Sequence, residues 1–267
     1  MKDLRLITIT LAMMTFVACG PIQRTRQSED TPVRTPETEN LLINLKKVSA
    51  RGFMFGHHDD TNYGIGWEGD EGRSDVKSVC GDYPAVISFD LGHIELGDTM
   101  SLDKVPFTKI RKEILNQYKR GGMSSLSWHL RNPLTGGDSW DVSDTTVVKS
   151  ILPGGANHEK FTGWVSKVSA FINSLQTEEG VKVPVLFRPW HEHTGSWFWW
   201  GEKLCTPEEY KALWHMTVDI LRNDGVDNAL YAYSPGSEPQ DTAQYLKRYP
   251  GDELIDLIGF DTYQFER

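Results

Sequence analysis

Short apolar runs alternate with segments of helical periodicity from residue 40 onward. The runs are rich in Val, Ile, Leu and Phe, which is typical of buried parallel strands. The predicted strands cover residues 53–56, 84–90, 122–129, 183–187, 229–234 and 254–261. The predicted helices cover residues 41–50, 107–120, 160–175 and 207–222, the last with Thr206 as N-cap and Pro207 at its first position. This alternation predicts an α/β fold, a (β/α)8 TIM barrel around a parallel sheet.

Six strands do not close an eight-stranded barrel, and the sequence ends at Arg267, directly after the sixth. One explanation is that two strands lie in a segment whose pattern does not reveal them. The other, which we favour, is that the chain lacks the C-terminal quarter of the domain. We therefore expect residues 39–267 to form an incomplete (β/α)8 catalytic domain in which strands seven and eight are missing.

Polar side chains follow the predicted strands at the points where those strands end. They are His57, Asp90, His129, Glu192, Ser234 and Asp261. Barrels of the (β/α)8 type place their chemistry at the carboxyl ends of their strands. We therefore expect a functional site at this edge of the sheet.

The segment after the fourth predicted strand is the most informative one. Residues 188–201 read Arg-Pro-Trp-His-Glu-His-Thr-Gly-Ser-Trp-Phe-Trp-Trp-Gly, with Glu192 between two histidines and four tryptophans from Trp190 to Trp200. Tryptophan stacks on the apolar face of a sugar ring, and an apolar surround raises a carboxyl pKa so that the group can donate a proton near neutrality. The segment therefore predicts a carbohydrate site with Glu192 as its acid. The alternative is a Trp-rich core segment with one surface glutamate.

The N-terminus has the pattern of a targeting segment. Lys2 and Arg5 precede an apolar run at residues 6–18 that is too short to span a bilayer. Ala18 directly before Cys19 resembles the lipobox of bacterial lipoproteins, in which the cysteine is lipidated. We expect a signal peptide at residues 1–19 and a flexible polar tether at residues 20–38. The protein is then exported and lipid-anchored to the bacterial cell envelope or, without lipidation, periplasmic or secreted.

Charge and cysteine content narrow the range of partners. The 267-residue chain has a formal net charge of −9 and no basic stripe to neutralise phosphates, which argues against nucleic acid as a partner.

Besides Cys19 there are Cys80 and Cys205, which either form a disulfide or stay separate buried thiols. We expect contact with a membrane only through the lipid anchor.

Four stretches together resemble glycoside hydrolase family 26, whose members are chiefly endo-β-1,4-mannanases. They are residues 55–60 (Phe-Gly-His-His-Asp-Asp) with Tyr63 and Gly64, residues 127–133 (Ser-Trp-His-Leu-Arg-Asn-Pro), residues 188–201, and residues 249–263. The resemblance implies a retaining enzyme on a (β/α)8 barrel, with the acid/base at the end of strand four and the nucleophile at the end of strand seven. It implies cleavage of internal β-1,4-mannosidic bonds in mannan, galactomannan or glucomannan, without a cofactor or a metal.

The same resemblance implies roles for individual residues. Glu192 falls at the acid/base position, with His191 beside it. The residues placed around the sugar at the cleavage point are His129, Trp197, Asp261 and Tyr263. The family's nucleophilic glutamate lies beyond the sixth strand, so we expect it to be absent from this chain. The resemblance supports neither Asp261 nor Glu95 nor Glu202 in that role.

Other readings of the same residues remain. Packing is the structural alternative for Trp197 and Tyr263, and ordinary hydrogen bonding is the alternative for His129 and Asp261. A non-catalytic, truncated mannan-binding fragment would bind the polysaccharide without turnover, and a family relative acting on xylan or mixed-linkage glucan would use the same acid.

A metal-dependent hydrolase is a rival of a different class. It would use His191 and His193 as a two-histidine zinc arm, with His57 and Asp59 as further ligands. Such a hydrolase does not need the tryptophan cluster. A metal assay after chelation distinguishes a metal-dependent hydrolase from a glycosidase.

Overall fold

The computed structural model describes residues 34–263. The helices are α1 (Pro36–Ser49), α2 (Asp75–Cys80), α3 (Phe107–Lys119), α4 (Val147–Ile151), α5 (His158–Asn173), α6 (Pro207–Asn223) and α7 (Thr242–Leu246), with a 3-10 turn η1 (Ile94–Leu96). The strands are β1 (Gly56–His58), β2 (Tyr63–Gly64), β3 (Trp67–Glu68), β4 (Val86–Asp90), β5 (Met123–Ser127), β6 (Val185–Arg188), β7 (Ala229–Tyr233) and β8 (Leu257–Ile258).

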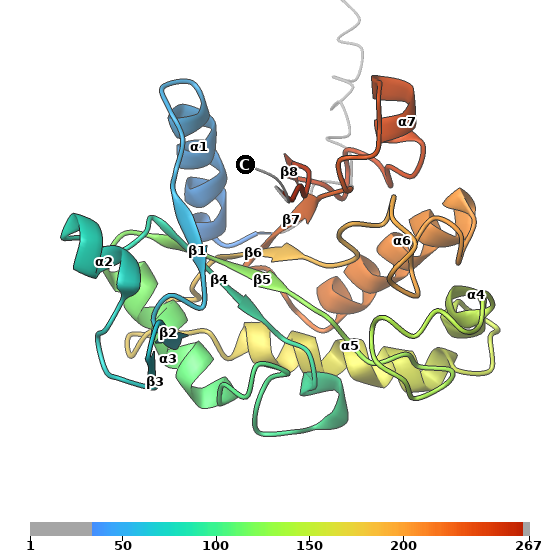
Figure 1. The fold of residues 1–267 in the computed structure, drawn as a ribbon, viewed down its shortest axis with the longest axis horizontal. Helices are drawn as coiled ribbons and strands as arrows, with labels where there is room; N and C mark the ends of the chain where they lie inside the picture. The colour runs from blue at the N-terminus through green and yellow to red at the C-terminus, as the bar shows by residue number, and fades with distance from the viewer. Residues whose placement is uncertain (1–33, 264–267) are drawn as a thin grey trace, which may run out of the picture. The chain divides into compact units, whose positions relative to one another are not determined.

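Within residues 34–263, six strands form one sheet in the order β1-β4-β5-β6-β7-β8. Every neighbouring pair in this sheet is parallel, and helices lie in the connections between the strands (Figure 1). Parallel neighbours that follow one another along the chain are what successive βα units produce. The prediction of an α/β fold of the (β/α)8 type is therefore confirmed.

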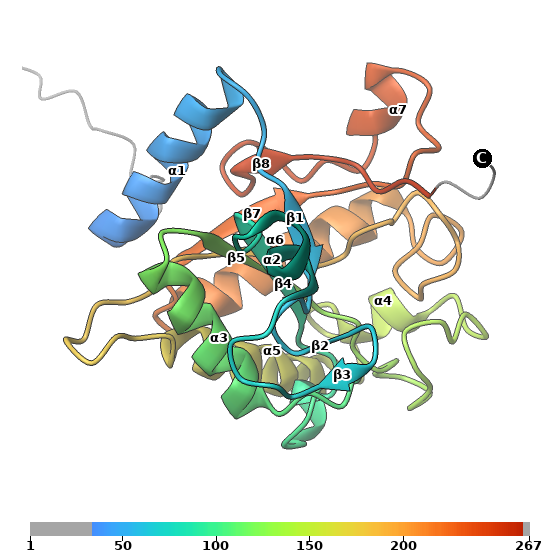
Figure 2. The same ribbon diagram turned by 60° about the vertical axis from the view of Figure 1, so that its left-hand side comes forward.

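The main hydrophobic core lies between the sheet and helices α3, α5 and α6 (Figures 1 and 2). Helix α3 buries Ile110 and Ile114, four residues apart, and α5 buries Val165 and Val168, three residues apart. These spacings put each pair on one face of its helix. Strand β5 is buried along its whole length. This core packs against the sheet and fixes the positions of the strands. The side chains at the carboxyl ends of the strands are therefore held in place.

The carboxyl ends of the central strands place polar residues side by side. Asp90 ends β4 and is the register partner of Ser127, which ends β5. Ser127 is in turn the register partner of Arg188, which ends β6. Three polar side chains from distant parts of the chain thus meet at one edge of the sheet.

Helix α6 begins where the sequence predicts. The side chain of Thr206 accepts a hydrogen bond from the backbone N–H of Glu209 at 3.1 Å, and the carboxylate of Glu209 accepts one from the backbone N–H of Thr206 at 2.9 Å. This reciprocal capping box satisfies N–H groups that the first turn leaves without partners, and Pro207 at the first helical position needs none. The cap fixes the point at which the Trp-rich segment leads into the helix.

The first strand lies later than predicted, at β1 rather than at residues 53–56. Phe53 and Phe55 are exposed, so the apolar character of that stretch does not mark a buried strand. Helices α2, α4 and α7 are absent from the prediction because five or six residues are too few to establish a helical period. The short antiparallel pair of β2 and β3 was not predicted either.

The folded domain begins before residue 39. Thr35 is the N-cap of α1 and accepts a hydrogen bond from the backbone N–H of Thr38 at 3.2 Å. Arg34 forms an ion pair with Asp256. The end of the predicted tether is therefore part of the fold, and the boundary at residues 38–39 is too late. The predicted signal peptide with Cys19 and the rest of the tether lie outside the described residues.

Helices in the described range are all too short or too polar to cross a bilayer. Cys80 and Cys205 are both free thiols, so the alternative of a disulfide between them is wrong. Cys205 is buried as expected, whereas Cys80 is exposed at the end of α2.

Candidate active site

Glu192 lies in a tight turn that follows β6. Its backbone N–H donates to the carbonyl oxygen of Ser234, directly after β7, at 2.8 Å. Glu192 and Trp190 both have left-handed backbone conformations, with φ of 54° and 56°. Residues other than glycine rarely adopt such conformations unless surrounding contacts enforce them. The turn is therefore strained, and the neighbouring strand helps to hold it.

Both carboxylate oxygens of Glu192 accept hydrogen bonds from aromatic side chains. The indole Nε1 of Trp197 donates to Oε2 at 2.7 Å, and the hydroxyl of Tyr263 donates to Oε1. The bond to Glu192 and burial raise the pKa of Tyr263 to about 12, so the phenol keeps its proton at neutral pH. Glu192 is only 6% exposed. Its carboxylate is thus fixed in direction, with a small part open to the cleft.

Two imidazoles form a polar chain beside Glu192. Nδ1 of His129 lies 2.6 Å from Oδ2 of Asp90, and Nε2 of His129 lies 3.0 Å from Nε2 of His191. Burial, with a smaller effect from Arg188, lowers the pKa of His191 well below its ordinary value. His191 is therefore neutral, and its ring and that of His129 share one proton in their contact.

Asp90 is the buried anion at the end of this chain. Burial opposes its ionisation, but hydrogen bonds outweigh burial and hold the pKa of Asp90 below its ordinary value. The bonds come from His129, from the hydroxyl of Ser127 at 2.6 Å and from the backbone N–H of Gly92 at 2.7 Å. The carboxylate thereby sets the orientation of the His129 ring.

Arg188 and Asp261 form the opposite side of the site. Nη1 of Arg188 donates to both carboxylate oxygens of Asp261, at 3.0 and 2.9 Å, and the hydroxyl of Ser234 donates to Oδ2 at 2.6 Å. Burial raises the pKa of Asp261, and Glu192 raises it further, whereas Arg188 and Ser234 oppose both effects. Asp261 is thus held as a partner of Arg188.

The cleft consists of two adjoining pockets that share His129, Glu192 and Tyr263. The inner pocket, of about 330 Å³, is lined mainly by the polar residues at the strand ends. The outer pocket, of about 460 Å³, has aromatic walls from Trp140 and Trp197. Small-molecule sites combine apolar walls with a few polar groups that fix orientation. This arrangement suits a chain of sugar rings that passes Glu192.

Trp140 is a site residue that the sequence analysis missed. It is 52% exposed, and its ring stacks on that of His129 with centroids 5.6 Å apart. Trp197 is 38% exposed, so both indoles present open faces to the cleft. The available signal was a tryptophan in a polar, Gly-rich segment, residues 136–140, shortly after a strand.

The structure brings the expected sugar-site residues together in these two pockets. They are His129, His191, Glu192, Trp197, Asp261 and Tyr263. One expectation was off by a residue, because His58 rather than His57 lines the inner pocket. Neighbouring residues of a strand face opposite sides, and Nδ1 of His57 lies 2.8 Å from the backbone oxygen of His58.

The rings of His191 and His193 do not converge as the arm of a metal site. The His193 ring packs between Tyr210 and Tyr233, with centroid distances of 4.4 and 4.9 Å, whereas His191 contacts His129. Burial lowers the pKa of His193 well below its ordinary value, so this ring is neutral. The two rings therefore do not form the zinc arm that the rival hypothesis of a metal-dependent hydrolase requires.

One other group of possible ligands, His58, Asp59 and Asp103, has its atoms within 4.8 Å of one another. Burial disfavours the charged imidazole, but hydrogen bonds to Asp103 and Asp59 raise the pKa of His58 to about 10. Nε2 of His58 lies 3.2 Å from the carboxylate of Asp59 and 4.0 Å from that of Asp103. We interpret this group as an ion-pair cluster at the edge of the inner pocket.

Several solved structures resemble this chain. A GH26 β-mannanase from Bacteroides ovatus is 64% identical and superposes with a TM-score of 0.87 over 88% of this chain and 68% of that one. An endo-β-1,4-mannanase from Cellulomonas fimi is 35% identical, with a TM-score of 0.80 over 88% of this chain and 53% of that one.

Curated sequences give the same picture. A mannan endo-1,4-β-mannosidase from Bifidobacterium adolescentis is 37% identical over 86% of this chain, and one from Bacillus subtilis is 27% identical over 86%. The chain spans 23% of the length of the first protein and 64% of that of the second. A sequence model of glycosyl hydrolase family 26 matches residues 31–266. The chain therefore belongs to glycosyl hydrolase family 26.

Proposed function

We propose that the protein is an endo-acting retaining glycoside hydrolase that cleaves internal β-1,4-mannosidic bonds in mannan, galactomannan or glucomannan. The observation that carries the proposal is the carboxylate of Glu192, fixed by Trp197 and Tyr263 between two pockets at the strand ends. Family membership and the mannanase names of the similar proteins support this substrate class.

Glu192 acts as the general acid and then as the general base. In the first step its proton goes to the glycosidic oxygen of the departing sugar, and in the second step it takes a proton from the attacking water. Its place between the two pockets supports this role, because the scissile oxygen must lie between the sugars on its two sides.

The remaining side chains hold the substrate. Trp140 and Trp197 stack on the sugar rings, since their exposed faces line the outer pocket. His129 lines both pockets and contacts the sugar there, with its ring oriented through Asp90 and His191. Further sugar hydroxyls at the cleavage point are held by Tyr263 and by the ion pair of Arg188 and Asp261. All three residues line the inner pocket.

A double displacement also needs a nucleophilic carboxylate about 5–5.5 Å from the acid. Asp261 is ill suited to attack a sugar, because Arg188 and Ser234 already bind its oxygens. Glu238 in the outer pocket accepts a hydrogen bond from the hydroxyl of Thr194 at 2.7 Å. We assign the nucleophile to neither, and its absence from residues 1–267 stays a prediction.

Replacing Glu192 by Gln in the intact protein tests the proposal. Turnover of mannan should fall about 10²- to 10⁴-fold, because general acid–base catalysis contributes that much. Calorimetric affinity for mannohexaose should change little, since the pocket walls remain. The matched control is Glu202→Gln, a half-exposed glutamate paired with Lys247, which should keep full activity.

Full turnover by Glu192→Gln would refute the assignment. Binding of mannohexaose by the unaltered intact protein, without any turnover, would instead support a non-catalytic binding protein. Faster turnover of xylan or mixed-linkage glucan than of mannan would show that the protein is a family relative with that polysaccharide as its substrate.

Export and lipid anchoring complete the proposal and rest on the sequence of residues 1–19. Lys2, Arg5, the apolar run and Cys19 support a lipoprotein signal. Radiolabelled palmitate should be incorporated during expression, and Cys19→Ala should abolish both the label and membrane fractionation. Unchanged labelling of that variant would exclude Cys19 as the anchor.

A further inference from the structure

Arg248 is a buried cation next to the turn that carries Glu192. It follows α7, is 2% exposed, and reaches across to the loop at residues 193–205. No described carboxylate lies within 4.0 Å of its guanidinium. Burial of a charge is costly unless hydrogen bonds compensate for the lost water. An apolar side chain would fill this space with a smaller desolvation penalty. Stability alone therefore does not explain why a guanidinium is buried here.

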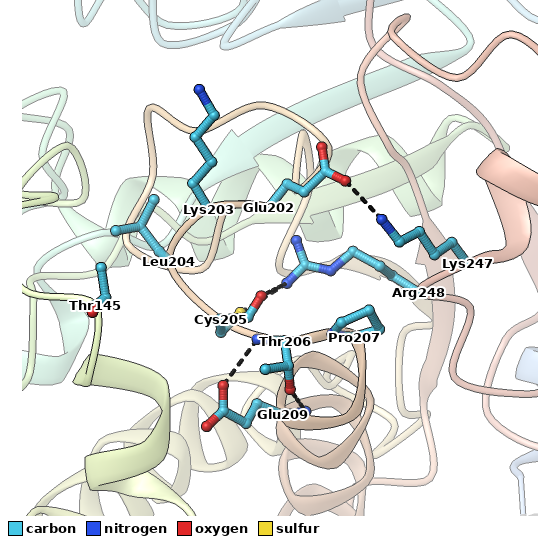
Figure 3. A pocket seen from close by; sticks show the side chains of 10 residues that line it. All are labelled: Thr145, Glu202, Lys203, Leu204, Cys205, Thr206, Pro207, Glu209, Lys247 and Arg248. Atoms are coloured by element: carbon cyan, nitrogen blue, oxygen red, sulfur yellow. Dashed lines mark hydrogen bonds and ion pairs between the residues drawn. The ribbon is translucent and has the colours of Figure 1, made fainter.

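The guanidinium binds both ends of the loop. Nη1 donates to the carbonyl oxygen of His193 at 2.7 Å, and Nη2 donates to the carbonyl oxygen of Cys205 at 3.2 Å. Nη2 also lies 2.8 Å from the Cys205 sulfur (Figure 3). His193 follows Glu192 directly, and the loop between the two anchors carries Trp197. One planar fork thus fixes both ends of a loop that begins next to Glu192 and carries Trp197, the hydrogen-bond donor to Glu192.

Tyr210 of α6 extends this support beneath the turn. Its ring lies 4.4 Å from the guanidinium carbon of Arg248, and its hydroxyl donates to the carbonyl oxygen of Trp190 at 2.7 Å. Trp190 and Glu192 are the two residues of the turn with left-handed backbones. The strained turn is therefore held on one side through Tyr210 and on the other through His193.

We propose that Arg248 is a positioning residue, which holds the turn at residues 190–193 so that the Glu192 carboxyl points at the glycosidic oxygen. This inference rests on the proposed function, since it assigns a support to that acid. Arg248 itself touches no substrate, because it is buried behind the loop and lines a separate pocket of about 340 Å³ (Figure 3). A misplacement of about 1 Å at a reacting centre can cost roughly 100-fold in rate.

The test compares two leaving groups in the intact protein. Unactivated mannopentaose needs a proton on its departing oxygen, whereas a dinitrophenyl β-mannobioside departs without one. In Arg248→Met, kcat/KM for mannopentaose should fall about 100-fold, and kcat/KM for the dinitrophenyl substrate should change less than about threefold, because the acid is not needed there. Lys247→Met is the matched control: it removes the adjacent, exposed cation and should leave both values unchanged.

An equal loss on both substrates, or no loss on either, would overturn the proposal. Arg248→Lys is the second variant, because it keeps the charge but lacks the planar fork; it should show the same selective loss. If neither variant folds, as judged by circular dichroism, Arg248 is a folding residue and the proposal is rejected. Glu192→Gln separates the two claims: if it keeps full turnover of mannopentaose, the proposed function fails, whatever Arg248 does.

Discussion

Nε2 of His129 and Nε2 of His191 lie 3.0 Å apart, and burial keeps the second ring neutral. Two ring nitrogens at this distance attract only if one of them carries a proton. The Asp90 carboxylate lies at the other nitrogen of His129, at 2.6 Å. The buried carboxylate of Asp90 thereby sets the orientation of the His129 ring and, through that ring, of His191.

Asp90→Asn should destabilise the fold in a pH-dependent way. The folded-state pKa of Asp90 is lowered, so its contribution is present above the unfolded-state pKa of about 3.9 and is lost as the pH falls through the folded pKa. Urea denaturation should show a loss of about 1–3 kcal/mol at pH 7 and a smaller loss at pH 3. Asp70→Asn, at an exposed pair with Arg73, is the control. The same deficit at both pH values would count against the hydrogen-bonded carboxylate.

Trp197→Phe separates the hydrogen bond of this residue from its aromatic face. The variant loses the donor to Oε2 of Glu192 but keeps a ring in the outer pocket. A hydrogen bond to a charged group contributes about 1.5–3 kcal/mol, so kcat on mannan should fall about 10- to 150-fold. KM should rise only slightly. Should KM carry the whole effect, Trp197 would serve only to bind the sugar.

Arg188→Met should leave the Asp261 carboxylate without its cation. Burial already raises the pKa of Asp261, and loss of Arg188 removes a group that opposes this. We expect a loss of activity that Arg188→Met/Asp261→Asn partly restores, with a coupling of about 0.5–3 kcal/mol in the double-mutant cycle. Strictly additive losses would show that the two residues act separately.

Thr206→Ala should weaken the start of α6. The capping hydrogen bond to the backbone of Glu209 is lost, which costs about 1 kcal/mol in the free energy of unfolding. Thr206→Ser keeps the hydroxyl and is the matched control in thermal denaturation. Equal stabilities of the Ala and Ser variants would mean that the cap contributes nothing.

The central strands were predictable because both of their faces are covered. A mostly apolar run such as residues 84–90 identifies such a strand without knowledge of its neighbours. Strand β1 was misplaced because it ends the sheet in the described range, where Phe53 and Phe55 remain exposed. Apolar character alone does not distinguish these two situations.

Glu192 was predictable because its chemistry is local, with histidines and tryptophans within a few residues. The partners of His129 were not, because Asp90 reaches it only through the register of β4 with β5. Arg248 carried no sequence signal at all. Its contact with Cys205 spans 43 residues and depends on how α7 leads back toward the loop.

The backbone of Glu192 also limits what can replace it. Aspartate and asparagine adopt a left-handed φ more readily than glutamate does, so an aspartate would relax the turn. Its side chain is one methylene shorter, and its carboxyl would stop short of a sugar oxygen that the longer side chain reaches. The turn thus contains a residue with an unfavourable backbone conformation, because only its longer side chain reaches the sugar oxygen. Substitutions at this position should therefore change the stability of the turn and the catalytic rate in opposite directions.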